Sequence, residues 1–563
     1  METRPWHQHY APGVPTAIDL EEVPLSRFLQ RTAARIPKNV AVSFPKCVLT
    51  YEALRSEAER LATAMQGMGI GPGKTVAIQL PNLPQTVIAT QAALMTGARV
   101  AMTNPLYTER EIVHQWNDAE AELAITTDFN WAARVRGLRD KVPVKNFIVA
   151  SIPEYMKFPF NLLAPLKLKK QDPPLFAKFA DEPGVHRFKK LTHSTAAALQ
   201  PVEVDMDDVA LLQYTGGTTG VSKGAMLTHR NIVANVHQIT AWFTGMQYGG
   251  EVLMTALPIF HVFGLTVCMT FGIWYGAELA LCPNPRDLPA VVDVVEQRGV
   301  TLFPAVPAMF NGLNNLPGIE SRNIASVKAC FSGSAPIAPD VLERFEALTG
   351  SRILEGFGMS ESSPVTHVNP IEGLRKIGSV GIPVSSTDAR VVDVDDPKKE
   401  MPVGEEGELV LRGPQVMKGY WKRDDETAKT ILDGWLHTGD LARVDEDGFF
   451  TIVGRKKDMI NCNGLKVFPD EVDAVLMSHA KILEAATIGV PDPERIETVK
   501  SFIVLQPGAS LSAEEVEAFA RENLAAYKIP REVEFLDELP KSTVLKVLRR
   551  ELRDRELAKR GPA

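Results

Sequence analysis

Apolar positions in the first part of the chain recur with helical spacing. Residues 51–68 place them at alternating steps of four and three, which predicts a helix with one apolar stripe that ends at Gly69. The apolar run 76–80 predicts a strand, residues 84–97 a second helix and residues 98–102 another strand. This alternation continues through Gly350 and is typical of parallel α/β units.

The pattern changes after about residue 377. Short strands preceded by turn residues, such as 408–411 and 449–453, predict a compact β-rich subdomain over about 377–456. Beyond it, a helical pattern, strands near 485–490 and 501–505, and another helix predict a small α+β domain. That last helix opens with Ser512 three residues before Glu515, which is a capping box. We therefore expect an α/β fold with a large N-terminal domain, residues 1–456, followed by a C-terminal domain, residues 457–563.

Charge and cysteine usage restrict the class of protein. The 563 residues carry 61 Lys and Arg against 69 Asp and Glu, a net charge of −8, which argues against broad nucleic-acid affinity. The five cysteines are odd in number and lack Cys-x-x-Cys spacing, so neither a zinc ribbon nor a disulfide framework is indicated. The first residues hold charge and proline where a signal peptide needs an apolar core. These features predict a large cytoplasmic enzyme.

One long uncharged stretch, residues 252–277, has the length of a membrane span. Pro258 and His261 interrupt its first part, several glycines dilute the rest, and no basic flank sets an orientation. We favour a buried core segment, with a membrane helix as the alternative.

The string YTGGTTGVSKG, residues 214–224, has the composition of a phosphate-binding loop. Its glycines let backbone N–H groups approach an anion, and hydroxyls and one cation complete the set. The residues concerned are Thr215, Gly216, Gly217, Thr218, Thr219, Gly220 and Lys223. It is not a Walker A loop, because Gly224 stands where Ser or Thr would hold magnesium. A flexible Gly/Thr turn is the alternative interpretation.

With this string the chain resembles the adenylate-forming superfamily and, within it, bacterial long-chain fatty-acid–CoA ligases. Further matching strings follow in order along nearly the whole chain. They are LPIFHVFG at 257–264, GFGMSE at 356–361, GELVLRGPQVMKGYW at 407–421, GWLHTGD at 434–440, GRKKDMI at 454–460 and LPKSTVLKVLRREL at 539–552. The resemblance implies ATP and Mg²⁺ as cofactors and coenzyme A as co-substrate.

The resemblance also implies roles for particular residues. It places Glu361 and Thr215 at magnesium, and Lys546 at the acyl carboxylate and the α-phosphate. For the rest of ATP it implies three groups of residues. The wall of the adenine site is Gly333, Ser334, Ala335, Pro336 and Glu355, and the segment after it is Gly356, Phe357, Gly358, Met359 and Ser360. The pair at the ribose is Asp440 and Arg455. Phe357 stands where the family usually has Tyr, so stacking on adenine is kept and a phenol hydrogen bond is lost. Leu545 stands where the family usually has Gly.

The fatty-acyl pocket is expected along the uncharged stretch, with His261 near the reacting carboxylate. Its expected lining is His261, Val262, Phe263, Gly264, Phe303, Pro304 and Val306. The resemblance further implies that the small C-terminal domain is mobile, with a hinge at Lys457 and a CoA channel beside Gly464.

The implied function is an ATP-dependent long-chain fatty acid–CoA ligase that works through an acyl-adenylate. Three alternatives stay open: a ligase for medium-chain or aryl acids such as coumarate, an enzyme that acylates a carrier protein, and a catalytically dead fatty-acid-binding scaffold. Oligomeric state is beyond the sequence, so a homodimer is also open.

Residues 155–190 mix lysines with aromatic and leucine side chains, on a chain whose total charge is negative. This mixture suits the headgroup boundary of an anionic membrane and predicts reversible, peripheral contact with the inner face of the cell membrane. The alternative is a surface loop whose aromatic side chains pack inward.

Overall fold

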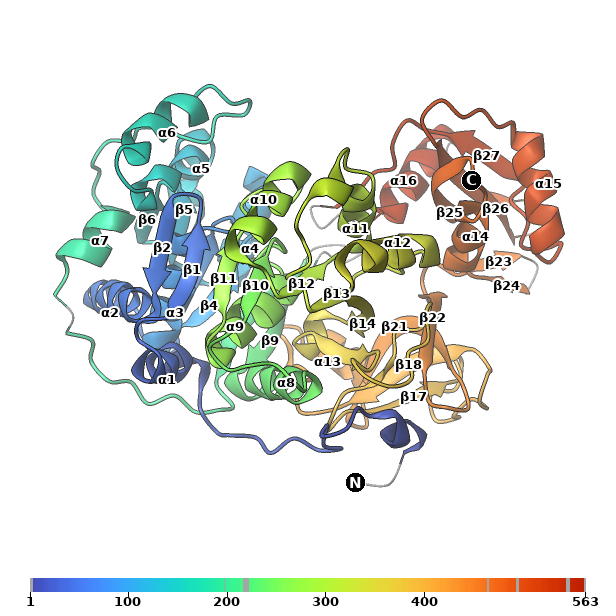
Figure 1. Ribbon diagram of the computed structural model, residues 1–563, viewed down its shortest axis with the longest axis horizontal. Coiled ribbons are helices and arrows are strands. Elements are labelled where there is room, and N and C mark those ends of the chain that lie inside the picture. Colours follow the sequence, from blue (N-terminus) through green and yellow to red (C-terminus); the bar gives the residue numbers. More distant parts are fainter. Residues whose placement is uncertain are drawn as a thin grey trace. The chain divides into compact units, whose positions relative to one another are not determined.

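The computed structural model describes residues 4–196, 198–215, 222–462, 465–492, 496–542 and 547–560. They form two compact units (Figure 1). The first contains His7–Thr387 and Gly413–Ile431, and the second contains Arg4–Trp6, Asp388–Arg412 and Leu432–Ala563. The chain therefore leaves the first unit, returns to it for a short stretch, and leaves it again.

The first unit contains an eight-stranded sheet whose central strands are parallel. Its spatial order is β19 (Gly419–Tyr420), β9 (Lys223–Thr228), β8 (Val209–Thr215), β4 (Arg99–Met102), β3 (Thr75–Gln79), β5 (Ala121–Thr127), β6 (Asn146–Ala150) and β7 (Val185–Arg187). The strand β9 is antiparallel to β8, and β19 closes the edge beside β9.

The same unit contains a nine-stranded sheet. Its order is β16 (Ile382–Pro383), β15 (Val365–Val368), β14 (Arg352–Gly358), β13 (Ala329–Ser332), β12 (Leu302–Ala305), β10 (Val252–Thr255), β11 (Glu278–Leu281), β1 (Val40–Phe44) and β2 (Cys47–Thr50). The strands from β14 to β1 are parallel neighbours. Their carboxyl ends therefore lie along one edge of the sheet.

Helices pack between and around these sheets (Figure 1). They are α1 (Phe28–Arg35), α2 (Tyr51–Gly67), α3 (Pro84–Met95), α4 (Glu109–Asp118), α5 (Asp128–Ala133), α6 (Phe160–Leu168), α7 (Phe188–Ser194), α8 (His229–Trp242), α9 (Phe271–Tyr275), α10 (Leu288–Arg298), α11 (Pro307–Asn314), α12 (Pro339–Thr349) and α13 (Asp424–Thr430). Helix α3 contacts β1 of one sheet and β3 and β4 of the other, and every residue of α3 is buried. A helix buried on all sides carries no charged side chain, and its sequence PQTVIATQAALM contains none.

The expected alternation of helix and strand is confirmed. Helix α2 buries its predicted stripe, and its N-cap Thr50 accepts a hydrogen bond from the backbone N–H of Ala53 at 3.2 Å. Strand β3, helix α3 and strand β4 follow within one or two residues of the expected bounds.

The second unit begins with an antiparallel sheet formed by β17 (Asp388–Val392), β18 (Gly407–Arg412), β21 (Trp435–Val444) and β22 (Phe450–Arg455), with β20 (Ile431–Leu432) beside β21. This is the β-rich part that the sequence predicts. The string GELVLRGPQVMKGYW is divided here, because its first six residues form β18 whereas its last nine belong to the first unit.

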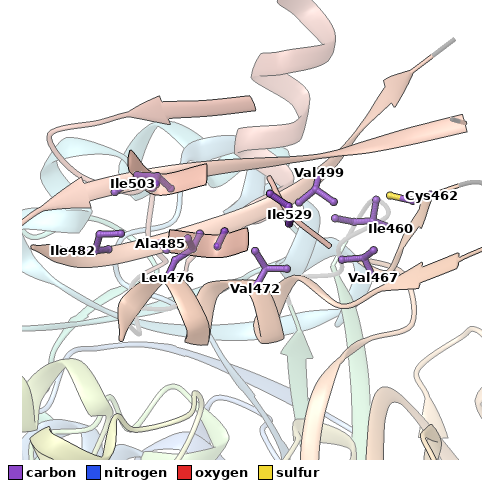
Figure 2. Close-up of a cluster of buried hydrophobic side chains, with 12 residues drawn as sticks. Ile460, Cys462, Val467, Val472, Leu476, Ile482, Ala485, Val499, Ile503 and Ile529 are labelled. Carbon is purple, nitrogen blue, oxygen red and sulfur yellow. The ribbon is translucent and has the colours of Figure 1, made fainter. Parts of the chain in front are cut away.

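The C-terminal part of the second unit is α+β, as expected. Its sheet contains β24 (Leu465–Val467), β23 (Ile460–Cys462), β26 (Ile496–Leu505), β25 (Ile482–Asp492) and β27 (Glu532–Phe535), and its helices are α14 (Pro469–Met477), α15 (Ala513–Asn523) and α16 (Arg549–Arg560). Figure 2 shows Val472 and Leu476 of α14 facing the strands, among Ile482, Val499 and Ile503. The capping box is present: Glu515 N–H donates to Ser512 Oγ at 3.2 Å, and Ser512 N–H donates to Glu515 Oε2 at 2.8 Å.

Candidate functional site

Four expected site segments follow the carboxyl ends of neighbouring parallel strands. Residues 257–264 follow β10, Val306 follows β12, residues 333–336 follow β13, and residues 355–361 form the end of β14 and the turn after it. Ligands of α/β proteins bind at this edge of a sheet. The first unit thus gathers segments that are far apart in the sequence.

The hairpin of β8 and β9 carries the expected phosphate loop. Its register pairs Thr215 with Lys223 and Tyr214 with Gly224, while Gly216, Gly217, Thr218, Thr219 and Gly220 lie outside the described residues. A Cβ on Gly224 would lie 3.1 Å from Tyr214 Cζ, so glycine lets the ring cross the neighbouring strand closely. The Tyr214 hydroxyl donates to Asp118 Oδ2 at 2.7 Å. This bond ties β8 to the end of helix α4.

Lys223 is already paired in this structure. Its ammonium group forms an ion pair with Glu426 of α13, and it lies 5.5 Å from the centroid of the Tyr420 ring. The hydrogen bond from Lys223 holds the pKa of Glu426 below its usual value. Both side chains are partly exposed, so solvent screens this pair and another anion can compete for the lysine.

Glu361 is a buried acid in the short turn η7 (Ser360–Ser362) after β14. The Tyr420 hydroxyl donates to Glu361 Oε1 at 2.8 Å, and the Met417 N–H donates to the Glu361 carbonyl at 2.8 Å. Burial, and then the Glu361 carboxylate, raise the pKa of Tyr420 above its usual value, so the phenol stays a donor. Strand β19 thus orients Glu361 while pairing with the phosphate hairpin at β9.

The expected adenine wall lies at the ends of β13 and β14. Ser332 and Glu355 are register partners, and Gly333 to Pro336 follow directly. Burial raises the pKa of Glu355 to about 7, although the Gly378 N–H donates to its Oε2 at 2.9 Å. A Cβ on Gly333 would lie 3.1 Å from Phe263 Cε1, so the wall directly contacts the expected acyl segment.

The uncharged stretch forms a buried core segment rather than a membrane span. Residues Phe263–Thr270 form a π-helix, η5, and all of them except Phe263 are buried. A Cβ on Gly264 would lie 2.3 Å from the carbonyl oxygen of Pro258, so only glycine allows this approach. Among the described residues, no helix combines the length and the apolar character needed to cross a bilayer.

Side-chain amides tie this segment to the eight-stranded sheet. Asn82, after β3, donates to the carbonyls of Thr255 and Leu257 at 2.9 Å each. Gln213 of β8 donates to the carbonyl of Phe260 at 3.1 Å. The phosphate hairpin and the expected acyl segment are therefore held in a fixed relation.

Two other expected acyl residues lie in different surroundings. The Phe303 ring packs with Phe310 of α11 and Phe345 of α12, at centroid distances of 5.9 and 6.0 Å. The Phe263 N–H approaches His261 Nδ1 at 3.3 Å, which orients the imidazole toward its own turn.

The expected ribose pair lies in the second unit. Asp440 of β21 and Arg455 of β22 are register partners, and Arg455 Nε lies 3.0 Å from Asp440 Oδ1. Asp440 is only 4% exposed, so this is a positioned acid rather than a loose surface charge. Lys457 lies in the turn between β22 and β23, whereas Gly464 and Lys546 lie outside the described residues.

The sequence did not single out Tyr420 or Glu426. Tyr420 lies within the string GELVLRGPQVMKGYW, so the sequence could have indicated it as a site residue. Glu426 is 203 positions from Lys223, and no local pattern connects them.

The comparisons with known proteins show that the chain is an enzyme and give its family. The AMP-binding enzyme model matches residues 29–421, and the AMP-binding enzyme C-terminal domain model matches residues 471–546. The chain belongs to the AMP-binding enzyme family.

Among curated relatives, the long-chain-fatty-acid–CoA ligase of Bacillus subtilis (strain 168) is 41% identical, over 98% of each chain. A protein of the same name from Escherichia coli O6:H1 is 39% identical, also over 98% of each chain. The 4-coumarate–CoA ligase 2 of Nicotiana tabacum is 30% identical, over 90% of this chain and 89% of its own.

Solved structures share the fold. The anthranilate CoA ligase AuaEII, in complex with anthranoyl-AMP, matches with a TM-score of 0.85 at 24% identity, over 96% of this chain and 98% of its own. The ATP-bound MatB of Rhodopseudomonas palustris matches with a TM-score of 0.82 at 27% identity, over 94% and 98%.

Proposed function

We propose that the protein is an ATP-dependent long-chain fatty acid–CoA ligase, which converts acid, ATP and CoA to acyl-CoA, AMP and diphosphate. The observation that carries this proposal is the 41% identity, across 98% of both chains, to a ligase of that name. The coumarate ligase is less similar, at 30% identity, which favours a fatty acid over an aryl acid.

In this reaction a carboxylate oxygen of the acid attacks the α-phosphorus of ATP, and diphosphate leaves. The CoA thiol then attacks the acyl carbonyl, and AMP leaves. For the nucleotide we propose Lys223 at the phosphates, Gly333 to Pro336 with Glu355 and Phe357 around adenine, and Asp440 with Arg455 at the ribose hydroxyls. The fixed hairpin and the buried Asp440 support these roles, since preorganised groups bind charge with little reorganisation.

Glu361 and Thr215 have the chemistry to hold magnesium. Glu361 is a buried carboxylate with one oxygen oriented by Tyr420, and Thr215 ends β8 with a hydroxyl; Mg²⁺ prefers such hard oxygen ligands. When bound there, the ion would neutralise charge on the ATP phosphates. The protein side chains themselves orient and hold the nucleotide.

The acid specificity can be tested directly. Diphosphate release is measured for acids from acetate to oleate and for coumarate, with and without CoA. Highest kcat/KM for the long-chain acids, with CoA required for turnover, is the expected result. Preference for coumarate would favour the aryl alternative, release without CoA acceptance would favour a carrier-protein enzyme, and no release with any acid would favour the scaffold.

For Lys546 we propose that its ammonium group offsets repulsion between the acyl carboxylate and the α-phosphate. Lys546→Ala should slow adenylation about a hundredfold or more, while thioester formation from supplied acyl-AMP stays largely intact. The neighbouring Lys541→Ala is a matched control for loss of one charge. Equal loss in both half-reactions would exclude a role specific to adenylation.

We also propose domains with a functional boundary at residue 457: an N-terminal domain of residues 1–456 and a mobile C-terminal domain of residues 457–563, with Lys457 as the hinge and Gly464 beside the CoA channel. The compact units differ from this division because packing defines them, whereas a hinge is defined by motion.

Reversible contact of residues 155–190 with an anionic membrane, at the inner face of the cell membrane, completes the proposal. Such contact suits an enzyme whose substrate acid is poorly soluble in water. A homodimer is a separate proposal, and light scattering of the purified protein tests it.

A further inference from the structure

Residues 157–170 present a row of large apolar side chains to solvent. Helix α6 buries none of its residues, and Figure 1 shows it at the periphery of the first unit. Its exposed apolar set, with the exposed fractions, is Phe158 at 78%, Phe160 at 42%, Leu162 at 64%, Leu163 at 56% and Leu166 at 67%. A contiguous apolar patch of this kind marks an interaction surface.

These side chains share one face of the helix. At 3.6 residues per turn, Phe160, Leu162, Leu163 and Leu166 fall within about half of the circumference. Asn161, Ala164, Pro165 and Leu168 fall on the other half and are less exposed. The outward face of α6 is thus the apolar one, the reverse of an ordinary surface helix.

Positive charge surrounds this apolar face. Lys157 precedes α6, Lys167 lies in its last turn, and Lys169 and Lys170 follow it, all of them exposed. Lys46, from the turn between β1 and β2, lies with its Nζ 5.0 Å from the centroid of the Phe160 ring. Helix α6 itself contains no Asp or Glu.

The rest of segment 155–190 is different. Arg187 pairs with Asp181 at 3.0 Å and lies over the Phe179 ring at 4.4 Å, and Phe179 packs against a buried cluster. Lys189 lies 3.7 Å from the centroid of the Tyr155 ring, and burial lowers its pKa. The later half of the segment therefore packs inward, as the alternative interpretation expects. The large apolar side chains that face solvent lie within residues 157–170.

We infer that α6 docks the protein onto an anionic lipid bilayer, with Phe158, Phe160, Leu162, Leu163 and Leu166 entering the headgroup boundary and the flanking lysines contacting lipid phosphates. Charge complementarity selects lipid as the occupant, since lysines rim the apolar face and no acid lies on the helix. This inference deepens the membrane contact of the proposed function, and its test does not depend on turnover.

Vesicle co-sedimentation tests the inference with the full-length protein. Wild type should bind phosphatidylglycerol-containing vesicles at low salt, less at high salt, and phosphatidylcholine vesicles weakly. The double variant Leu163→Glu/Leu166→Glu and the triple variant Lys167→Glu/Lys169→Glu/Lys170→Glu should each bind at least tenfold more weakly. Matched controls are Leu106→Glu, at a 64% exposed leucine elsewhere in the first unit, and Lys178→Glu, in the later half of the segment.

Insertion can be measured separately. All five native cysteines are buried, so Leu163→Cys introduces a selectively reactive thiol for an environment-sensitive dye. A blue shift of its emission on addition of anionic vesicles is expected, and the same dye at Leu106→Cys should not shift.

Three results would overturn the inference. They are absence of vesicle binding at low salt, equal binding by wild type and both α6 variants, or α6 variants that convert a dimer to a monomer with unchanged vesicle binding. The last would identify a second copy of the chain as the occupant. Diphosphate release with a soluble medium-chain acid should be unchanged in the variants, which separates failure of docking from failure of the enzyme.

Discussion

Two buried glutamates near the end of β14 occupy different environments only six positions apart. Glu355 accepts backbone hydrogen bonds from Gly378, at 2.9 Å, and from Ile337, but burial dominates, so its pKa rises to about 7. Glu361 accepts from a phenol hydroxyl and is oriented by β19. The end of β14 therefore separates an acid that holds its proton near neutrality from an acid in η7 that has the chemistry of a metal ligand.

The raised pKa of Glu355 predicts a pH dependence of stability. The folded state binds this proton more tightly than the unfolded state, so Glu355 favours folding at low pH. That contribution is lost as pH rises from about 4.5 to about 7. The free energy of unfolding of wild type relative to Glu355→Gln should fall by at most about 1.4 kcal/mol per pH unit across this window and stay constant above it. Urea denaturation at a series of pH values measures this, and a difference independent of pH would contradict it.

The ion pair between Lys223 and Glu426 predicts that the Glu426 carboxylate competes with the phosphates of ATP for the lysine. Phosphate oxygens must displace the Glu426 carboxylate before they reach the ammonium group. Glu426→Gln should therefore lower the KM for ATP by up to about fivefold, the range of an exposed ion pair. Asp425→Asn is the control, because Asp425 is 70% exposed and lies 3.9 Å from Lys429. A rise in KM would show instead that Glu426 positions Lys223.

At the residue scale, the sequence could identify functional side chains that lie within a short string matching the family. Lys223 and Glu361 lie in such strings, and both lie beside the β9–β19 strand pair. Asp440 and Arg455, which are expected together at the ribose, form an ion pair at 3.0 Å, and their role at the ribose stays a prediction. Glu426 could not be found, since its partner is fixed by tertiary packing and not by any local spacing.

Elements with strong local signals were predicted almost completely. Helix α2 and the cap of α15 depend on periodicity and on residues within one turn. The π-helix η5 was not predicted, because an uncharged stretch has no amphipathic period to read. Its geometry depends on the close approach of Gly264 to the turn at Pro258, which is a tertiary contact.

Gly264→Ala should destabilise the protein by about 1–3 kcal/mol or more, because its Cβ would meet the Pro258 and Leu257 carbonyl oxygens at 2.3 and 2.7 Å. The control is Gly67→Ala at the end of α2, where nothing lies within 4 Å and a gain of up to about 1 kcal/mol is expected. Thermal unfolding of the three proteins compares them. Equal midpoints for Gly264→Ala and wild type would show that the η5 backbone yields easily.

At the scale of the whole molecule, the layout of parallel α/β sheets, β-rich part and C-terminal α+β part followed from the order of elements. The return of Gly413–Ile431 to the first unit did not. It depends on the pairing of β19 with β9, strands separated by nearly two hundred residues, and such long-range pairing leaves no local pattern in the sequence.

The proposed hinge predicts a separation of the two half-reactions. Proline fixes φ near about −65°, so Lys457→Pro should hold the C-terminal domain in one orientation. Acyl-AMP should still form while thioester formation stalls. Quench-flow measurement of each half-reaction tests this, with Lys456→Ala as a control for the charge. Full CoA-dependent turnover by the proline variant would remove Lys457 from the hinge role.

The β9–β19 pair also constrains the order in which the polypeptide can mature on the ribosome. Until residue 420 has emerged, the phosphate hairpin has an open strand edge at β9, and Glu361 lacks the phenol that orients it. A nascent chain that stops in β18 would already contain nearly all of both large sheets but not the strand that pairs with β9. Synthesis of the second unit must therefore begin before the first can be completed.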